Sequence, residues 1–282
     1  MNDLSGSVPV TILNGFLGSG KTTLLQNLIV QARRMDGLKL AVIVNEMSEL
    51  DVDGRILDAT EILSRQDAMF VSIPAGSISS EDGLAQFAAG VDKLRASGAT
   101  HIIIETSGSA HPWPLLEAIR TSDAVQLHGF LSVVDTVTLA QDHDFGRAIV
   151  PTASANLAAD RRGVANLLAE QIMFANRILL SKMDRLEMEH IRTVAEAIHP
   201  INPGADIVAM KWGNVKLTDI LVMPPYDHAR VATLGAELTE WDATHGTSSM
   251  ASAADYQIDS IVISDPRPMH PQRLWDVYNH FL

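Results

Sequence analysis

Three glycines, a lysine and two threonines stand close together near the start of the sequence, and their types and spacing suit phosphate binding. The segment from Gly15 to Thr22 fits the pattern G-x-x-x-x-G-K-[ST]. Gly15, Gly18 and Gly20 would let the backbone turn with its N–H groups directed inward, which forms a nest for phosphate oxygens. Lys21 would reach the β- and γ-phosphates of a nucleotide, and the Thr22 hydroxyl would be a ligand of Mg²⁺. The predicted phosphate-binding residues are Gly15, Gly18, Ser19, Gly20, Lys21, Thr22 and Thr23.

The segments on either side of this turn are those that a phosphate-binding loop requires. Residues 10–13, of which three are apolar, predict a buried strand, and a helix is expected to begin near Lys21. One face of that helix would carry Leu24, Leu25, Leu28 and Ile29. The positive end of the helix dipole would then face the same phosphate. A glycine-rich turn that binds nothing is the alternative, and these flanking elements argue against it.

Apolar runs that end in polar side chains recur along the chain, with helical stretches such as residues 81–95 between them. These runs predict further strands within residues 40–44, 68–73, 101–108, 129–135 and 177–184. Strands alternating with helices indicate a mainly parallel sheet with right-handed crossovers. Ligands of such sheets bind at the carboxyl ends of the strands. The predicted fold class is therefore an α/β P-loop NTPase, with helices on both faces of the sheet.

An acid at the end of one predicted strand is a candidate for holding Mg²⁺. Glu105 follows the apolar residues 102–104, and a P-loop nucleotide hydrolase needs a carboxylate there, bound to the metal directly or through water. Gly108 could approach the γ-phosphate with its N–H, so that the segment would change shape on hydrolysis. Taken alone, Glu105 would be better explained as a solvated acid at a strand end. Together with the P-loop it is interpreted as catalytic, as is Lys21.

A second motif far downstream points to the base of the nucleotide. Ser181, Lys182 and Asp184 fit the [NTS]-K-x-D element of guanine-specific proteins. Asp184 would accept hydrogen bonds from the guanine N1–H and 2-amino groups, which adenine lacks, and Lys182 would lie along the base plane. By itself an S-K-x-D sequence is usually a helix start with a capping residue, and the order of the motifs along the chain favours the base-binding role.

Composition excludes several classes of protein. With 21 basic and 34 acidic residues the formal net charge is −13, which argues against a general nucleic-acid surface. No apolar run approaches the length that spans a membrane, and the first residues lack the features of a signal peptide. The absence of cysteine excludes disulfides and thiolate metal sites. These features predict a soluble cytoplasmic protein.

The order of these motifs resembles that of the CobW-type GTPases, which are relatives of the hydrogenase- and urease-maturation GTPases. The matching segments are residues 15–23, 44–46 with Asp53, 105–108 with Ala110 and Pro112, 133–135, 181–184, 201–203 and 267–274. The resemblance implies a Mg²⁺-dependent GTPase that delivers a metal, often zinc or cobalt, to a client protein. No residue stands out as a base that positions water, so the intrinsic hydrolysis is expected to be slow.

The chain departs from this family at its metal motif, Gly-Cys-x-Cys-Cys, because that position here reads Gly76-Ser77-Ile78-Ser79-Ser80. Serine hydroxyls are poor ligands of Zn²⁺. Oxygen and nitrogen ligands for a transition metal would instead come from Glu46 and Glu49 in an acidic loop, and from His111. Ordinary roles, a solvated loop and a packing histidine, are the alternatives.

The domain organisation follows the change in composition after residue 222. We expect a P-loop domain over residues 1–222, a linker over 223–255, and at 256–282 the start of an α+β C-terminal domain that is cut short. An apolar face on the last helix would dock on the main domain or pair with a second chain. This face comprises Leu274, Trp275, Tyr278 and Phe281.

Two other functions stay open at this point. The missing cysteines favour a nucleotide-gated interaction module that binds a protein partner and no longer carries a metal. A P-loop kinase of a small molecule is the third possibility, and it would need an acceptor pocket with its own base. All three functions require a bound nucleotide and Mg²⁺, and none predicts nucleic acid or membrane as a partner.

Overall fold

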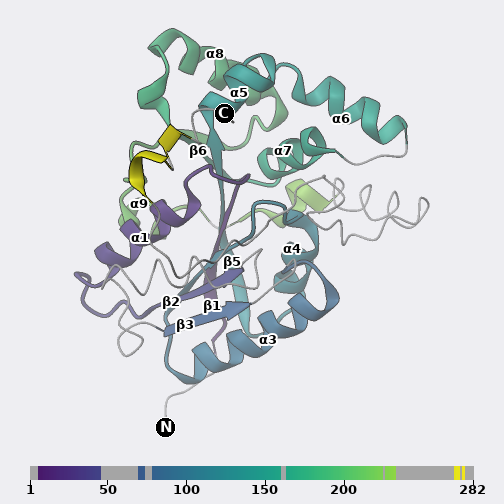
Figure 1. The fold of residues 1–282 in the computed structure, drawn as a ribbon. Helices are drawn as coiled ribbons and strands as arrows, with labels where there is room; N and C mark the ends of the chain where they lie inside the picture. The colour runs from purple at the N-terminus through teal and green to yellow at the C-terminus, as the bar shows by residue number, and fades with distance from the viewer. Residues whose placement is uncertain are drawn as a thin grey trace.

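The computed structural model describes residues 6–45, 69–73, 78–159, 163–224, 226–232, 270–273 and 275–276. Within them, seven strands form one sheet in the order β3-β2-β4-β1-β5-β6-β7, and every neighbouring pair is parallel (Figure 1). The strands are β1 (Val8–Asn14), β2 (Leu40–Asn45), β3 (Met69–Ile73), β4 (His101–Glu105), β5 (Val125–Asp135), β6 (Arg177–Ser181) and β7 (Asp206–Ala209). The predicted P-loop NTPase fold with a parallel sheet is confirmed.

Helices cover both faces of this sheet, as predicted. The helices are α1 (Lys21–Ala32), α3 (Glu81–Ala96), α4 (Pro112–Arg120), α5 (Thr136–Asp142), α6 (Ile149–Ala158), α7 (Val164–Met173), α8 (Met188–Ile198) and α9 (Leu217–Leu221), with short 3₁₀ turns η1 (Asp144–Gly146), η2 (Met183–Arg185) and η3 (His199–Ile201). In Figure 1, α1 and α9 lie on one side of the sheet, and α3 and α4 lie on the other.

The two faces hold separate apolar cores because side chains of a strand alternate between them. On β4, Ile102 and Ile104 pack into one core, and Ile103 packs into the other. The first core also receives α3, α4, α7 and α8, whereas the second receives α1 and α9. Leu24, Leu25, Leu28 and Ile29 of α1 are buried in that second core, as their spacing predicts.

The observed elements differ from the predicted ones in two places. Strand β5 begins at Val125, four residues before the predicted start at Gly129, and β7 was not predicted at all. Most of residues 223–282, which hold the predicted linker and C-terminal segment, lies outside the described residues. Within the described part of the chain, no helix is both long and apolar enough to cross a membrane.

A buried histidine at the amino-terminal end of β4 makes the stability of this fold depend on pH. The Nε2 atom of His101 lies 2.8 Å from the Thr11 hydroxyl, and its ring meets that of His128 edge to face. Burial, followed by the nearby His128, lowers the pKa of His101 to about 4. The unfolded chain binds a proton at this histidine near pH 6.5, whereas the folded chain does so only near pH 4. The contribution of neutral His101 to the free energy of unfolding is therefore fully present above pH 6.5 and is lost as the pH falls toward 4.

We therefore expect a His101→Gln variant to unfold with a weaker pH dependence than the parent chain. The introduced glutamine keeps a polar group beside Thr11 but takes up no proton. Between pH 6.5 and 4 the parent should lose on the order of 3 kcal/mol more of its free energy of unfolding than the variant. Urea unfolding at a series of pH values checks this, and parallel curves for the two proteins would contradict it.

Candidate nucleotide-binding site

The segment between β1 and α1 has the geometry of a phosphate-binding loop. Gly15, Gly18 and Gly20 all have positive φ angles, of 146°, 68° and 103°. A side chain at Gly15 would also place its Cβ 2.3 Å from the Val133 carbonyl oxygen, so no other residue fits there without displacing β5. Helix α1 then begins at Lys21, with no acidic residue in its first turn to occupy the positive end of the dipole. The predicted P-loop conformation is thus present.

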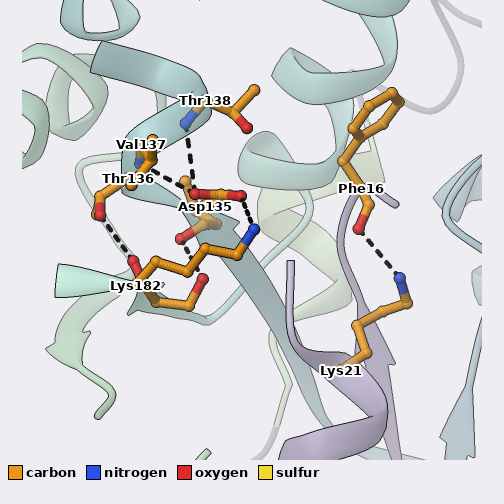
Figure 2. A network of polar contacts seen from close by, with 9 residues as sticks. Phe16, Lys21, Asp135, Thr136, Val137, Thr138 and Lys182 are labelled. Carbon is orange, nitrogen blue, oxygen red and sulfur yellow. Dashed lines mark hydrogen bonds and ion pairs between the residues drawn. The ribbon is translucent and has the colours of Figure 1, made fainter. Parts of the chain in front are cut away.

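Lys21 lies at the floor of this loop. Its side chain is buried, and its ammonium group donates hydrogen bonds to the carbonyl oxygens of Gly15 at 2.8 Å and Phe16 at 3.1 Å. Figure 2 shows the lysine turned back toward Phe16 from the start of α1. These carbonyl groups hold the cation inside the loop, where it would face the phosphates of a nucleotide.

The two residues predicted to hold Mg²⁺ are in contact. The Thr22 hydroxyl donates a hydrogen bond of 2.6 Å to Glu105 Oε1, and Glu105 is only 3% exposed. The contact joins residues 83 positions apart, because β4 lies directly beside β1 in the sheet. A hydroxyl and a carboxylate oxygen are the hard donors that Mg²⁺ prefers, so these residues fit that ion.

The segment after β4 closes one side of the site. Gly108 approaches the P-loop so closely that a Cβ would lie 2.6 Å from the backbone nitrogen of Leu17. Its carbonyl oxygen accepts a hydrogen bond of 3.3 Å from Gln171 of α7. A cleft of about 340 Å³ lies between the two loops. It is lined by Leu17, Gly18, Gly20, Lys21, Thr22, Thr23, Asn45, Glu105, Thr106, Ser107 and Gly108.

Two buried hydroxyl groups at this site have no hydrogen-bond partner within the described part of the chain. They are Ser19 Oγ in the P-loop and Ser107 Oγ, whose residue lines the cleft. A buried polar group without a partner is costly, and a phosphate bound in the cleft would supply an acceptor for Ser107. Ser19 is not among the residues that line the cleft, so its place among the phosphate-binding residues stays a prediction.

The predicted base-binding residues lie at the end of β6. Lys182 has a left-handed backbone with φ of 54°, and Asp184 follows in η2 with an exposed side chain. Strand β5 alone separates β6 from β1, so the two motifs lie roughly 10 Å apart along the carboxyl edge of the sheet. The base and the phosphates of one nucleotide are separated by a similar length, because a ribose lies between them.

Asp135 organises this end of the site, a role that the sequence did not indicate. One carboxylate oxygen accepts hydrogen bonds from the backbone N–H groups of Val137 and Thr138 at the start of α5. The other accepts a hydrogen bond of 2.5 Å from the Lys182 ammonium group, as Figure 2 shows. Asp135 therefore fixes the direction of the Lys182 side chain. Its position at the end of the apolar run 129–134 is the signal that could have revealed it.

Ser181 and His111 make structural contacts. The Ser181 hydroxyl is buried and donates to the Val134 carbonyl oxygen at 3.2 Å, so its part in nucleotide binding stays a prediction. The His111 ring is also buried, and its Nδ1 lies 2.8 Å from a carboxylate oxygen of Glu170. Within the described ranges, no three histidine or acidic side chains form a metal-binding group. The other candidates, Glu46 and Glu49, lie outside those ranges.

Asn45 is a further residue whose role emerges only from the structure. Its buried side-chain oxygen accepts hydrogen bonds from the backbone N–H groups of Ile78 at 3.0 Å and Ser107 at 3.4 Å. The Ser79 hydroxyl, at the position of a family cysteine, donates to the His111 carbonyl oxygen at 2.7 Å. Hydrogen bonds thus tie residues 78 and 79 to the segment that carries Glu105 and Gly108.

Comparison with known proteins agrees with this geometry. Residues 9–209 match the family model described as CobW/HypB/UreG, nucleotide-binding domain. The chain is 31% identical over 290 residues to the zinc-regulated GTPase metalloprotein activator 1 of Dictyostelium discoideum, covering 96% of this chain and 59% of that protein. It is 32% identical over 206 residues to the zinc chaperone CobW of a Sinorhizobium species, covering 68% and 56%. The chain thus spans little more than half the length of either relative.

Solved structures of related proteins were found as well. The crystal structure of HypB from Helicobacter pylori in complex with nickel is 17% identical, with a TM-score of 0.48 and coverage of 85% of this chain and 89% of that one. Because the family model spans well over half of the chain, the family is established by sequence. The protein belongs to the CobW/HypB/UreG family, and the P-loop cleft with Thr22 and Glu105 lies within its nucleotide-binding domain.

Proposed function

We propose that this chain binds GTP together with Mg²⁺ at the carboxyl edge of the sheet and hydrolyses the GTP slowly. This hydrolysis would be coupled to the maturation of a metalloprotein. The observation that carries the proposal is the 2.6 Å contact between Thr22 and Glu105 inside the P-loop cleft. Asp184, on the same edge of the sheet, supports guanine as the base.

Each residue of the cleft has a role in this proposal. The Lys21 ammonium group and the backbone N–H groups of the P-loop bind the phosphates, and Gly108 presents its N–H to the γ-phosphate. Thr22 and Glu105 would hold Mg²⁺, which when bound neutralises charge on the β- and γ-phosphates. No base for water is identified among the described residues, so we expect the intrinsic rate to be slow until a partner or a metal completes the site.

Titration of the purified chain with GTP and ATP, with and without Mg²⁺, tests this proposal. We expect tight, Mg²⁺-dependent binding of GTP, much weaker binding of ATP, and slow release of phosphate from GTP. Equal affinity for the two nucleotides would show that the Asp184 assignment is wrong. Failure to bind either nucleotide would overturn the proposal as a whole.

The identity of the metal that GTP hydrolysis would help to deliver is a separate question. Both relatives described above carry zinc in their names, which supports zinc as the cargo, whereas this chain has no cysteine to bind it. Zinc and cobalt titrations of the protein loaded with GDP, or with a non-hydrolysable GTP analogue, address this. Tight binding that differs between the two states supports metal delivery on Glu, Asp and His ligands. Absence of specific binding in either state would overturn it.

A nucleotide-gated interaction module without a metal is the second candidate, and one observation favours it. Asn45 accepts hydrogen bonds from the N–H groups of Ile78 and Ser107, and the Ser79 hydroxyl donates to the His111 carbonyl oxygen, so hydrogen bonds link residues 78 and 79 to the segment after β4. A conformational change caused by loss of the γ-phosphate would then be transmitted to the neighbouring helix α3 without any bound metal. This candidate predicts that a protein partner binds one nucleotide state preferentially, and that added zinc or cobalt leaves this preference unchanged.

A further inference from the structure

A tight turn after β7 presents a tryptophan to solvent in an unusual conformation. A β-bridge between Lys211 and Asn214 closes the turn, and Trp212 has a left-handed backbone with φ of 55°. A bulky residue in this region is strained, and such strain persists only where the surroundings hold it. The Trp212 side chain is nevertheless 70% exposed, so burial of its ring is not what compensates for the strain.

Helix α1 holds this turn in place. Asn27 donates a hydrogen bond of 3.0 Å to the Trp212 carbonyl oxygen, and Gln31 binds the Val215 carbonyl oxygen and the Leu217 N–H, both at 2.8 Å. Gly213 packs on the first turn of the helix so closely that a Cβ would lie 2.9 Å from the backbone of Thr23 and Leu24. The helix that carries Lys21 and Thr22 therefore also fixes the position of Trp212.

Trp212 lines the same pocket as Asp184, the predicted base-binding acid. This pocket of about 550 Å³ lies between η2 and the turn after β7. It is lined by Met183, Asp184, Leu186, Met188, Ile191, Ala209, Lys211, Trp212 and Asn214. A purine needs polar partners at its edge and an apolar or aromatic surface against its face. Asp184 supplies the first, and Trp212 is the aromatic side chain that can supply the second.

We propose that Trp212 stacks on the face of the guanine whose edge Asp184 binds, and that it is a positioning residue for the nucleotide. The inference rests on the proposed GTP binding and deepens it. Because α1 carries both the phosphate-binding residues and the anchors of the turn, the two ends of the nucleotide would be held by one rigid element. An exposed tryptophan, and Met188, which lines the same pocket and is 73% exposed, would then be covered by the ligand rather than left in water.

Ligands with and without a base test this inference. Inorganic tripolyphosphate occupies only the phosphate site, whereas GDP occupies both sites. We expect Trp212→Ala to weaken GDP binding by about 10- to 100-fold, the usual effect of losing one base–aromatic contact. Tripolyphosphate binding should be unchanged, and Trp212→Phe, which keeps an aromatic face, should bind GDP within a few-fold of the parent chain.

Fluorescence of the native tryptophans is an independent measurement. GDP, but not tripolyphosphate, should change the emission of the parent chain. The Trp212→Phe variant should lose that change. The Trp275→Phe variant, altered at another exposed tryptophan, should retain it.

Unchanged GDP affinity of Trp212→Ala would overturn the inference, and this pocket would then have another occupant, such as a protein partner. Equal loss of GDP and tripolyphosphate binding would overturn it too, by showing a purely structural role. If the parent chain binds neither ligand, the proposed function itself fails.

Discussion

Replacing Lys21 with alanine is expected to lower kcat/KM for GTP hydrolysis by about 100- to 1,000-fold, the usual effect of removing one preorganised group that stabilises the transition state. The lysine is buried in the P-loop and held by the carbonyl oxygens of Gly15 and Phe16. Its charge therefore acts in a site with little water, where electrostatic interactions are stronger than at the surface. Phosphate release measured over a range of GTP concentrations checks the prediction.

A matched control is Lys39→Ala, which removes the same charge from an exposed position between α1 and β2. This variant should hydrolyse GTP like the parent chain. Lys21→Arg should stay strongly impaired despite its charge, because the planar guanidinium group does not fit the place of a compact ammonium group. Circular dichroism and thermal unfolding show whether the variants fold. A folded Lys21→Ala protein with full activity would contradict the proposed role.

The second large effect concerns the choice of base. Asp184→Asn is expected to lower the affinity for GTP by about 100-fold and to remove most of the preference for GTP over ATP. The carboxylate can accept two hydrogen bonds from guanine, whereas the amide of asparagine offers one acceptor and turns a donor toward the base. Xanthine carries a carbonyl group where guanine has the 2-amino group. Xanthosine triphosphate should therefore bind the variant better than it binds the parent chain.

Competition binding with GTP, ATP and xanthosine triphosphate measures these changes. Asp92→Asn removes one carboxylate from an exposed position on α3 and should leave all three affinities unchanged. Tripolyphosphate should bind Asp184→Asn like the parent chain, since the phosphate site is formed by other residues. A variant that keeps the full preference for GTP would show that another residue selects the base.

The phosphate site could be predicted from sequence because its requirements are local. Gly15, Gly18 and Gly20 adopt the positive φ angles that their spacing indicates, and α1 begins at Lys21 as predicted. The buried strands could be predicted as well, because a run of apolar residues is itself the signal of burial. Since parallel strands end at the same edge of the sheet, an acid that follows such a run, such as Glu105, is expected at that edge. The strand missed was β7, whose four residues are only half buried or exposed, so it lacks that signal.

The pairing of distant residues was decided by the tertiary structure. The sequence alone indicated the P-loop, the acid at Glu105 and the S-K-x-D motif, and hence a nucleotide site at the end of a parallel sheet. It did not indicate that Asp135 holds Lys182, or that Asn27 anchors Trp212 from 185 positions away. Such contacts depend on which strands become neighbours and which helix lies over them. The crossovers of the whole sheet determine that order, and no local pattern of residues records it.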